Sequence, residues 1–346
     1  MRTAFVIAAA IACPQPALAQ HAIFAGSDLS AQAATPAARA VIARAQAALG
    51  RPPGAIPKLH TEGTLPGHGI RDVSIAAKAD HPIVLDLALA WAITRDRRYL
   101  DQAARYLENW ADTYQMSFNP IDETSFDMLV LANDLTASDL PRPLAAKLDG
   151  FWRRMASGYL DAMDGKPHNA HTNWQSHRIK LATLAAYRTG DTRLIERARA
   201  AYRRQVAVNL RPDGSTFDFE ERDALHYVTY NLDPLMTAAL AARAHGENWF
   251  DWKAPSGASL ARSVDWLATF ARGERTHIEF AHSKIAFDRE RAAAGQKEYA
   301  PHAWNPVQAL NTFALASRFD PRHALLRDTL AQRSGRSPAS WMVLIQ

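Results

Sequence analysis

Apolar residues recur every three to four positions along most of this chain, which is the spacing of one helix face. The first such segment follows Thr35, a plausible N-cap, and ends at Gly50 with two prolines beyond it. From position 82 onward, similar segments follow one another in pairs joined by short turns. We therefore predict helices at 36–49, 82–94, 99–114, 125–137, 143–163, 174–189, 194–210, 222–245, 256–272, 306–317 and 323–332.

Strand signals are scarce, because period-two alternation is found only in a possible short run at 277–280. The stretch 51–80 is rich in Pro, Gly and His and is expected to be irregular. Successive helical hairpins must stack to bury their apolar faces. The pattern predicts an all-α fold, an incomplete α/α toroid with a central cleft, built as a single domain over 20–346. An open solenoid is the alternative, but no residue pattern repeats at a fixed period.

The N-terminus has the features of a secretory signal peptide. Arg2 precedes a short apolar run at 4–12, and Ala17-Leu18-Ala19 supplies the small residues that signal peptidase accepts. We expect cleavage after Ala19, so that 1–19 is removed and the protein is exported to the periplasm. A lipoprotein cleavage at Cys13 is the weaker alternative. The apolar run is too short to span a membrane, and no membrane association is expected.

Composition narrows the choice of partner only slightly. The chain is 48% hydrophobic and 22% charged, as globular domains are. Cys13 is its single cysteine, which leaves no disulfide and no thiolate metal site after cleavage. A net charge of +5 favours an anionic partner weakly. Export and the lack of a Lys/Arg-rich run argue against nucleic acid. We expect a monomer.

The first segment that carries chemistry is 168–178, at the start of a predicted helix. Three His, two Asn, one Trp and one Arg within eleven residues suggest a site rather than an ordinary polar helix start. A zinc site is a second functional interpretation, but there is no His-Glu-x-x-His pattern and no cysteine. The candidates in this segment are Asn169, His171, Asn173, Trp174, His177 and Arg178.

The second segment, 222–230, also opens a predicted helix. Arg222, His226 and Tyr230 are spaced four apart and would share one stripe, which Tyr227 borders. The plain structural interpretation is that the tyrosines are semi-buried aromatics and that Arg222 pairs with Asp218. Two such segments about fifty residues apart, each at a helix start, favour function.

Other polar residues are weaker candidates, for which solvated surface is the default interpretation. They lie in the early irregular stretch and in another near the C-terminus, and either stretch could reach over a cleft. They are Lys58, His60, His68, Arg71, Lys284, Arg289, Arg291, Tyr299, His302 and Trp304.

These residue types suit β-elimination on a uronic-acid polymer. Removing the acidic proton at C5 expels the 4-linked sugar, provided that the carboxylate is neutralised, a base acts at C5 and an acid acts at the leaving oxygen. Asn, His and Arg can neutralise a carboxylate, His or Tyr can take the proton, and Tyr can donate one. The two segments supply all of these groups.

Two other functions remain open. A glycoside hydrolase needs two carboxylates that flank the scissile bond. The acidic residues at 213–223 offer some, but they are bunched in one place and no clear second carboxylate is found elsewhere. A non-catalytic periplasmic binder of acidic glycans would explain Trp and Arg but gives no reason for the His/Tyr pairing.

At these residues the sequence resembles the alginate lyase family of helical-toroid polysaccharide lyases. Asn169-Ala-His171-Thr-Asn-Trp174 resembles its Asn-Asn-His-x-x-Trp motif. The segment from Arg222 through Tyr227 and Tyr230 to Pro234-Leu resembles its Arg-Ala-Leu-x-Tyr-x-x-Tyr-x-Leu-x-Pro-Leu helix. The early hairpin at 82–110 is similar as well. The resemblance implies a lyase that requires no cofactor and no metal, although calcium could bind without a visible motif.

The resemblance also implies roles. His171 takes the place of the family histidine. Tyr227, or else Tyr230, takes the place of the tyrosine that acts as acid and often as base. Arg222 takes the place of the family arginine approximately. Ala170 stands where the family has a functional Asn, so Asn169, Asn173, or His177 with Arg178 must neutralise the carboxylate. We therefore expect a 1,4-linked polyuronate, poly-β-D-glucuronate or poly-β-D-mannuronate, as substrate. The expected substrate-binding residues are Asn169, Trp174, Arg178, His226, Lys58 and Lys284.

Overall fold

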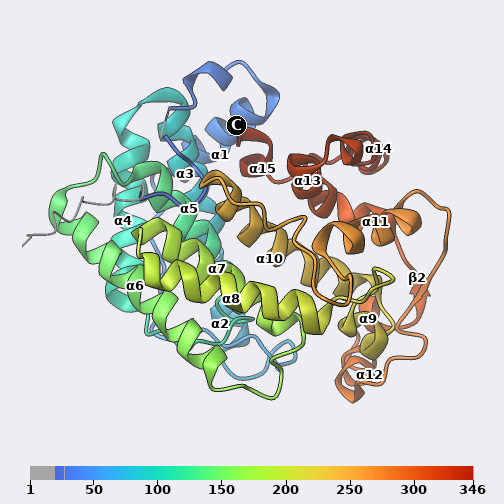
Figure 1. Cartoon of the computed structure of the whole chain (residues 1–346). Coiled ribbons are helices and arrows are strands. Elements are labelled where there is room, and N and C mark those ends of the chain that lie inside the picture. The colour runs from blue at the N-terminus through green and yellow to red at the C-terminus, as the bar shows by residue number, and fades with distance from the viewer. Residues whose placement is uncertain (1–19, 27, 346) are drawn as a thin grey trace, which may run out of the picture.

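The structure is a computed structural model that describes residues 20–26 and 28–345, so the predicted signal peptide and Cys13 lie outside the described residues. Helices dominate it, as predicted (Figure 1). In chain order they are α1 (Pro36–Ala48), α2 (Arg71–Lys78), α3 (Asp80–Thr94), α4 (Arg97–Thr113), α5 (Phe126–Thr136), α6 (Arg142–Asp164), α7 (Asn173–Thr189), α8 (Thr192–Asn209), α9 (Phe217–Arg222), α10 (Leu225–Ala244), α11 (Leu260–Ala271), α12 (Ala286–Ala293), α13 (Leu310–Phe319), α14 (Ala324–Ser334) and α15 (Ser340–Leu344).

The hairpins end and begin where the local sequence favours it. Gly190 closes α7 in the left-handed conformation with a φ of 65°, which costs glycine little. Asp191 then caps α8, because its side chain accepts from the amides of Arg193 and Leu194. Asp96 caps α4 in the same way after the left-handed Arg95. These turns set helix against helix and confirm the predicted incomplete α/α toroid.

Helix α7 is the centre of the fold. It is buried along almost its whole length and packs against α6, α8, α10 and α5. A helix that is covered on all sides needs few charged residues, and those it carries must find partners. Its first two turns hold Asn173, Ser176, His177 and Lys180, all of them buried. The polar start of α7 therefore faces the interior of the protein.

Several predicted boundaries are wrong. The helix predicted at 222–245 begins only at Leu225, because Arg222 is the last residue of α9 and Asp223 adopts a left-handed φ of 49° between α9 and α10. Asp tolerates this conformation better than most residues. The stretch 51–80 was expected to be irregular but contains α2. The helix predicted at 256–272 begins only at Leu260, where Ser259 supplies the N-cap, and the one predicted from Pro306 opens with a 3₁₀ turn, Pro306–Ala309.

The possible strand at 277–280 is confirmed in part. It forms the two-residue strand β1 (Ile278–Glu279), which pairs antiparallel with β2 (His302–Ala303). The segment between the two strands contains α12 and the 3₁₀ turn Lys297–Tyr299. It lies at the same end of the molecule as α9 (Figure 1). The short sheet thus holds this segment beside the start of α10.

The first described residues are built into the core. The buried carboxylate of Asp134 accepts hydrogen bonds from the backbone amides of Ala22, Ile23 and Phe24 at 2.6 to 2.8 Å. The His21 ring stacks on His245 with 4.3 Å between centroids. Charge-assisted bonds to a buried carboxylate are among the stronger ones in proteins. The chain is therefore held firmly from residue 21 onward.

Candidate active site

The break between α9 and α10 turns Arg222 back against Tyr227. The Arg222 guanidinium donates to the Tyr227 hydroxyl at 2.7 Å and lies over the ring, with Cζ 4.0 Å from its centroid. It also forms a 2.5 Å ion pair with Asp288, which is 1% exposed. The pairing that the plain structural interpretation expected, with Asp218, is not the one observed. Arg222 is instead held between α10 and α12.

Helix α12 supplies a second guanidinium to the same hydroxyl. Arg291 donates to the Tyr227 hydroxyl at 3.2 Å and lies 4.5 Å from the ring centroids of Phe287 and Tyr299. Among the described residues it has no carboxylate partner within ion-pair distance. Arg291 is thus a positive charge held by aromatic rings, and its charge remains available to an anion.

Four aromatic rings gather where α10 begins. His226 contacts Tyr227 edge-on at 5.0 Å between centroids and lies parallel to Tyr230 at 6.2 Å. His177 of α7 packs on the other side of Tyr230, at 4.3 Å. Burial lowers the pKa of His226 to about 4, with help from Arg222 and Arg291. His226 is therefore a neutral imidazole at neutral pH.

The two tyrosines differ in what surrounds their hydroxyls. Burial raises the pKa of both above the usual value, so both carry a proton at neutral pH. Tyr227 is 5% exposed, and its hydroxyl is occupied by two guanidinium groups. Tyr230 is only half-buried, and its hydroxyl makes no hydrogen bond among the described residues. Tyr230 is therefore the more accessible of the two hydroxyls, whereas the Tyr227 oxygen already accepts two hydrogen bonds.

His177 is buried, neutral and held from one side. Its Nδ1 lies 2.8 Å from the Thr124 hydroxyl. Burial lowers its pKa well below the usual value, and Lys180 adds to this effect. Lys180 is itself paired with Asp127 at 2.6 Å. A neutral imidazole can donate one hydrogen bond and accept another without adding charge.

Asn173 belongs to a buried hydrogen-bond network that joins four helices. Its side-chain amide donates to Asp218 of α9 at 2.6 Å, and Asn209 of α8 donates to the other oxygen of the same carboxylate at 2.7 Å. Asn209 in turn accepts from Asn231 of α10, which accepts from Ser176 of α7. Buried networks of this kind are costly to break. The network fixes α9 and α10 relative to α7.

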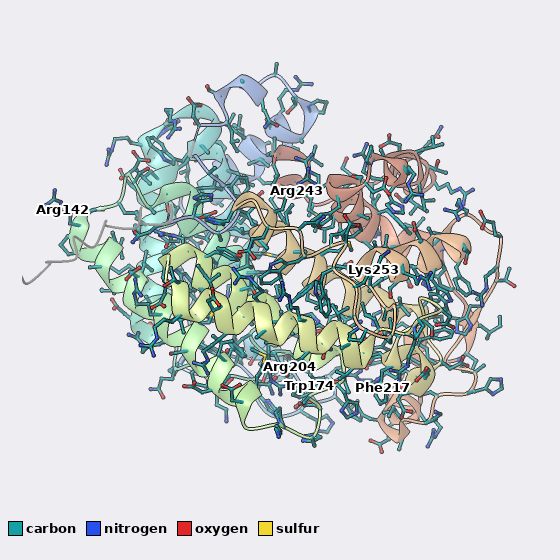
Figure 2. The ribbon with its side chains drawn as sticks, in the orientation of Figure 1. Arg142, Trp174, Arg204, Phe217, Arg243 and Lys253 are labelled. Atoms are coloured by element: carbon teal, nitrogen blue, oxygen red, sulfur yellow. The ribbon has the colours of Figure 1, made fainter. Side chains whose placement is uncertain are left out.

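The remaining residues of the first segment do not meet the ring cluster. His171 is exposed and contacts Phe217 edge-on at 4.5 Å. The Arg178 guanidinium lies 5.8 Å from the centroid of the Trp174 ring and donates to the side-chain oxygen of Gln175. Figure 2 shows Trp174 and Phe217 at the end of the molecule where α7 and α9 begin. Asn169 is buried, with a side-chain oxygen that lacks a hydrogen-bond partner.

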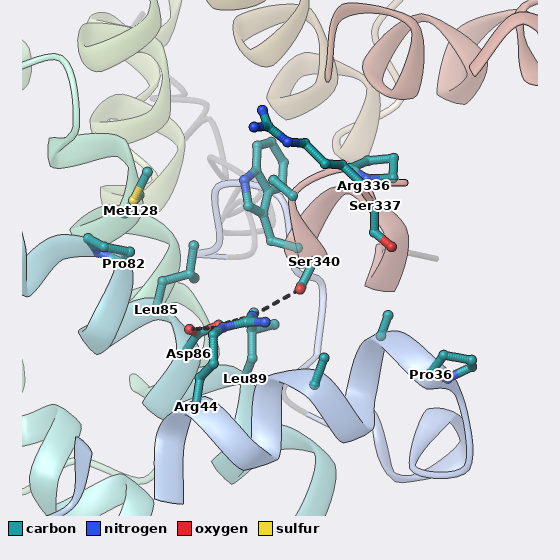
Figure 3. Close-up of a pocket in the computed structure, with 15 residues that line it drawn as sticks. Pro36, Arg44, Pro82, Leu85, Asp86, Leu89, Met128, Arg336, Ser337 and Ser340 are labelled. Carbon is teal, nitrogen blue, oxygen red and sulfur yellow. Dashed lines mark hydrogen bonds and ion pairs between the residues drawn. The ribbon is translucent and has the colours of Figure 1, made fainter. Parts of the chain in front are cut away.

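The predicted lysines are at the surface. Lys58 is exposed, and Lys284 forms an ion pair with Glu221 at 3.1 Å. Lys284 also lines a polar hollow of about 600 Å³ beside α9, together with Asp223, Trp266 and Arg275. A second hollow of about 570 Å³ lies between α1, α3 and α15, where Arg44 bridges Asp86 and Ser340 (Figure 3). It is distant from α9 and is mainly apolar, so we do not assign the site to it.

The segment Asp122-Glu123-Thr124-Ser125 was not among the site residues predicted from the sequence. Asp122 accepts from the backbone amides of Thr61 and Glu62, which holds the early irregular stretch in place. Glu123 accepts from the hydroxyls of Tyr114 and Tyr159. No motif marks these four residues, since their partners are distant in the chain. Asp288 was also missed, and Arg291 was treated as surface.

Neither a membrane-spanning helix nor a metal-ligand cluster is found among the described residues. No described helix is long and apolar enough to cross a membrane. Within residues 20–26 and 28–345, no group of three or more His, Cys, Asp or Glu side chains is placed to hold a metal ion. The ring cluster itself presents tyrosine hydroxyls, imidazoles and guanidinium cations.

The fold is thus a helical toroid that gathers tyrosine, imidazole and guanidinium groups at the start of one helix. The family model "Alginate lyase" matches residues 25–277. The chain therefore belongs to the alginate lyase family and is a polysaccharide lyase. The match ends before α12, so Asp288 and Arg291 lie beyond it.

Solved structures of alginate lyases share the fold. An alginate lyase from Bacteroides ovatus has 17% identity and a TM-score of 0.65, with 92% of this chain and 95% of that chain covered. Alginate lyase A1-III from Sphingomonas species A1 has 16% identity and a TM-score of 0.53, with 76% and 83% covered. A variant of A1-III complexed with a tetrasaccharide has 15% identity and the same TM-score, with 74% and 86% covered. Comparison with curated protein sequences gave no match.

Proposed function

We propose that this lyase cleaves a 1,4-linked polyuronate, either poly-β-D-glucuronate or poly-β-D-mannuronate, by β-elimination at the ring cluster of α10. The observation that supports this most directly is the grouping of a half-buried Tyr230 hydroxyl, a neutral His226 and the uncompensated Arg291. Together they offer an acid, a base and a cation for the carboxylate.

The proposed elimination uses Arg291, His226 and Tyr230. Arg291, with Arg222 behind it, attracts the uronate carboxylate and lowers the energy of the charge that develops there. Neutral His226 takes the C5 proton, and the electron pair left on C5 forms the C4–C5 double bond. The bond from C4 to the glycosidic oxygen breaks, and Tyr230 donates its proton to that oxygen. His226 then returns a proton to Tyr230 through solvent, which restores both groups.

This assignment differs from the roles that the resemblance implied. His171 contacts Phe217 at the surface, so we assign the base to His226 and the support of the Tyr230 ring to His177. We place the acid at Tyr230, because its hydroxyl is free of hydrogen bonds among the described residues and its side chain is more exposed than that of Tyr227. Asn173 is bonded to Asp218, and we assign it to the support of α9 and α10.

Ultraviolet absorbance of the unsaturated product tests the reaction. We expect absorbance to rise when the purified protein is given poly-β-D-glucuronate or poly-β-D-mannuronate, because each elimination leaves a double bond conjugated to the carboxylate. Neutral glucans with the same linkage serve as the control and should give no signal. Reducing ends that appear without absorbance would favour a hydrolase instead, and binding without either product would favour a glycan-binding protein.

We also infer that the protein acts in the periplasm after removal of 1–19. The inference is supported by the hydrogen bonds from the backbone amides of residues 22–24 to Asp134, because these residues follow the expected cleavage site directly. Cleavage after Ala19 would leave a single residue before the stacked His21. We expect intact-mass measurement of the protein from a periplasmic extract to show a chain that begins at Gln20. A cytoplasmic, full-length chain would contradict this.

A further inference from the structure

Pro234 lies inside α10, four residues after Tyr230. Proline has no amide hydrogen, so it cannot form the helical hydrogen bond to the carbonyl four residues earlier. The carbonyl of Tyr230 therefore lacks its regular helical partner. An unpaired carbonyl in a buried helix is costly unless another donor is near.

The His177 ring is the neighbour of that carbonyl. It packs against Tyr230 from α7, and a hydrogen bond to the Tyr230 backbone partly offsets the lowering of its pKa by burial. Its Nε2 makes no hydrogen bond of strict geometry among the described residues and is buried. Nε2 is therefore the nitrogen that is free to donate to the Tyr230 carbonyl.

The Thr124 hydroxyl determines which nitrogen of His177 carries the proton. Its oxygen lies 3.2 Å from the Lys180 ammonium, which can only donate, and 2.8 Å from His177 Nδ1. Lys180 is held there by further bonds to the Thr124 carbonyl at 2.8 Å and to Asp127. Among the described residues the hydroxyl has one other neighbour within hydrogen-bond distance, Nδ1, so its own hydrogen is satisfied only by donating there. A neutral His177 must then carry its proton on Nε2.

We propose that Thr124 and Pro234 are positioning residues for catalysis, which together hold His177 as the Nε2–H tautomer against the Tyr230 backbone. Thr124 sets the tautomer by donating to Nδ1 of the His177 ring. Pro234 leaves the Tyr230 carbonyl free to accept from Nε2. The result is a fixed orientation of the start of α10, and with it of the Tyr230 hydroxyl. This proposal rests on the proposed role of Tyr230, and it assigns to the proline of α10 a function beyond bending the helix.

Nitrogen NMR of ¹⁵N-histidine-labelled protein tests the tautomer directly. In the unaltered protein we expect the His177 Nδ1 signal in the unprotonated range and the Nε2 signal in the protonated range. Thr124→Val keeps the shape of the side chain but removes the hydroxyl, and should mix or reverse the tautomers. Thr124→Ser should restore the original pattern. A His177 that carries its proton on Nδ1 in the unaltered protein would overturn the proposal.

The kinetic effect should fall on kcat. We expect Thr124→Val and Pro234→Ala each to lower kcat about 10- to 100-fold with little change in KM, because a small misplacement of a reacting group is costly. In Pro234→Ala the new amide hydrogen takes the Tyr230 carbonyl away from His177. Thr183→Val is the matched control, since the buried Thr183 hydroxyl on α7 has no hydrogen-bond partner. Full kcat in both test variants would overturn the proposal.

The tautomer readout is independent of turnover, which separates the two proposals. If no polyuronate is cleaved but the tautomer still depends on Thr124, the structural part of this inference stands and the proposed function fails. If elimination occurs and depends on Tyr230, but the His177 tautomer is unchanged in Thr124→Val, the proposed function stands and this inference fails.

Discussion

Replacing Tyr230 by Phe is expected to lower kcat by about 10²- to 10⁴-fold, the range that removal of a general acid produces. The substitution removes only the hydroxyl oxygen. The ring should keep its 4.3 Å contact with His177, so KM and the unfolding free energy should change little. Initial rates of product absorbance on the preferred polyuronate measure the effect, and thermal unfolding checks the fold.

Tyr227→Phe is the matched variant, three residues earlier on the same helix. It removes a hydroxyl that accepts from Arg222 at 2.7 Å and from Arg291 at 3.2 Å. We expect kcat to fall roughly tenfold, because this is the effect of losing one hydrogen bond to a charged group. The reverse order, with Tyr227→Phe much the slower variant, would return the acid role to Tyr227.

Arg222→Gln is expected to lower kcat/KM by about 10²- to 10³-fold, as loss of a single stabilising group in an active site does. It should also lower the unfolding free energy by about 3 kcal/mol, because Asp288 would be left as a buried, unpaired carboxylate. Rates and denaturant unfolding of the same preparation measure both effects.

A second variant separates these two effects. In the double variant Arg222→Gln with Asp288→Asn, the buried charge is removed, so stability should recover while activity remains low. Arg211→Gln is the control, because Arg211 pairs at the surface with Glu220 of the same short helix α9, and its loss should cost less than about 1 kcal/mol. Activity that recovers together with stability would show that Arg222 acts only through the fold.

The helical hairpins were predictable because their signals are local. Capping residues such as Asp191 and closing glycines such as Gly190 act on the turn in which they stand. Helical periodicity needs only the residues within one or two turns. For the same reason the missed break at Asp223 was hard to foresee: the sequence on both sides is helical, and a left-handed Asp has no strong local signature.

The pattern of residues alone was sufficient to predict the toroid and the family, and it indicated two segments as candidates for the chemistry. The contacts that decide roles join positions far apart: His177 to Thr124, Arg222 to Asp288, and Asn173 to Asp218. Such partners depend on how helices pack, and no spacing along the chain encodes them. Packing turned His177 rather than His171 toward Tyr230, and it brought Asp288 of α12 to Arg222 and Arg291 of α12 to Tyr227.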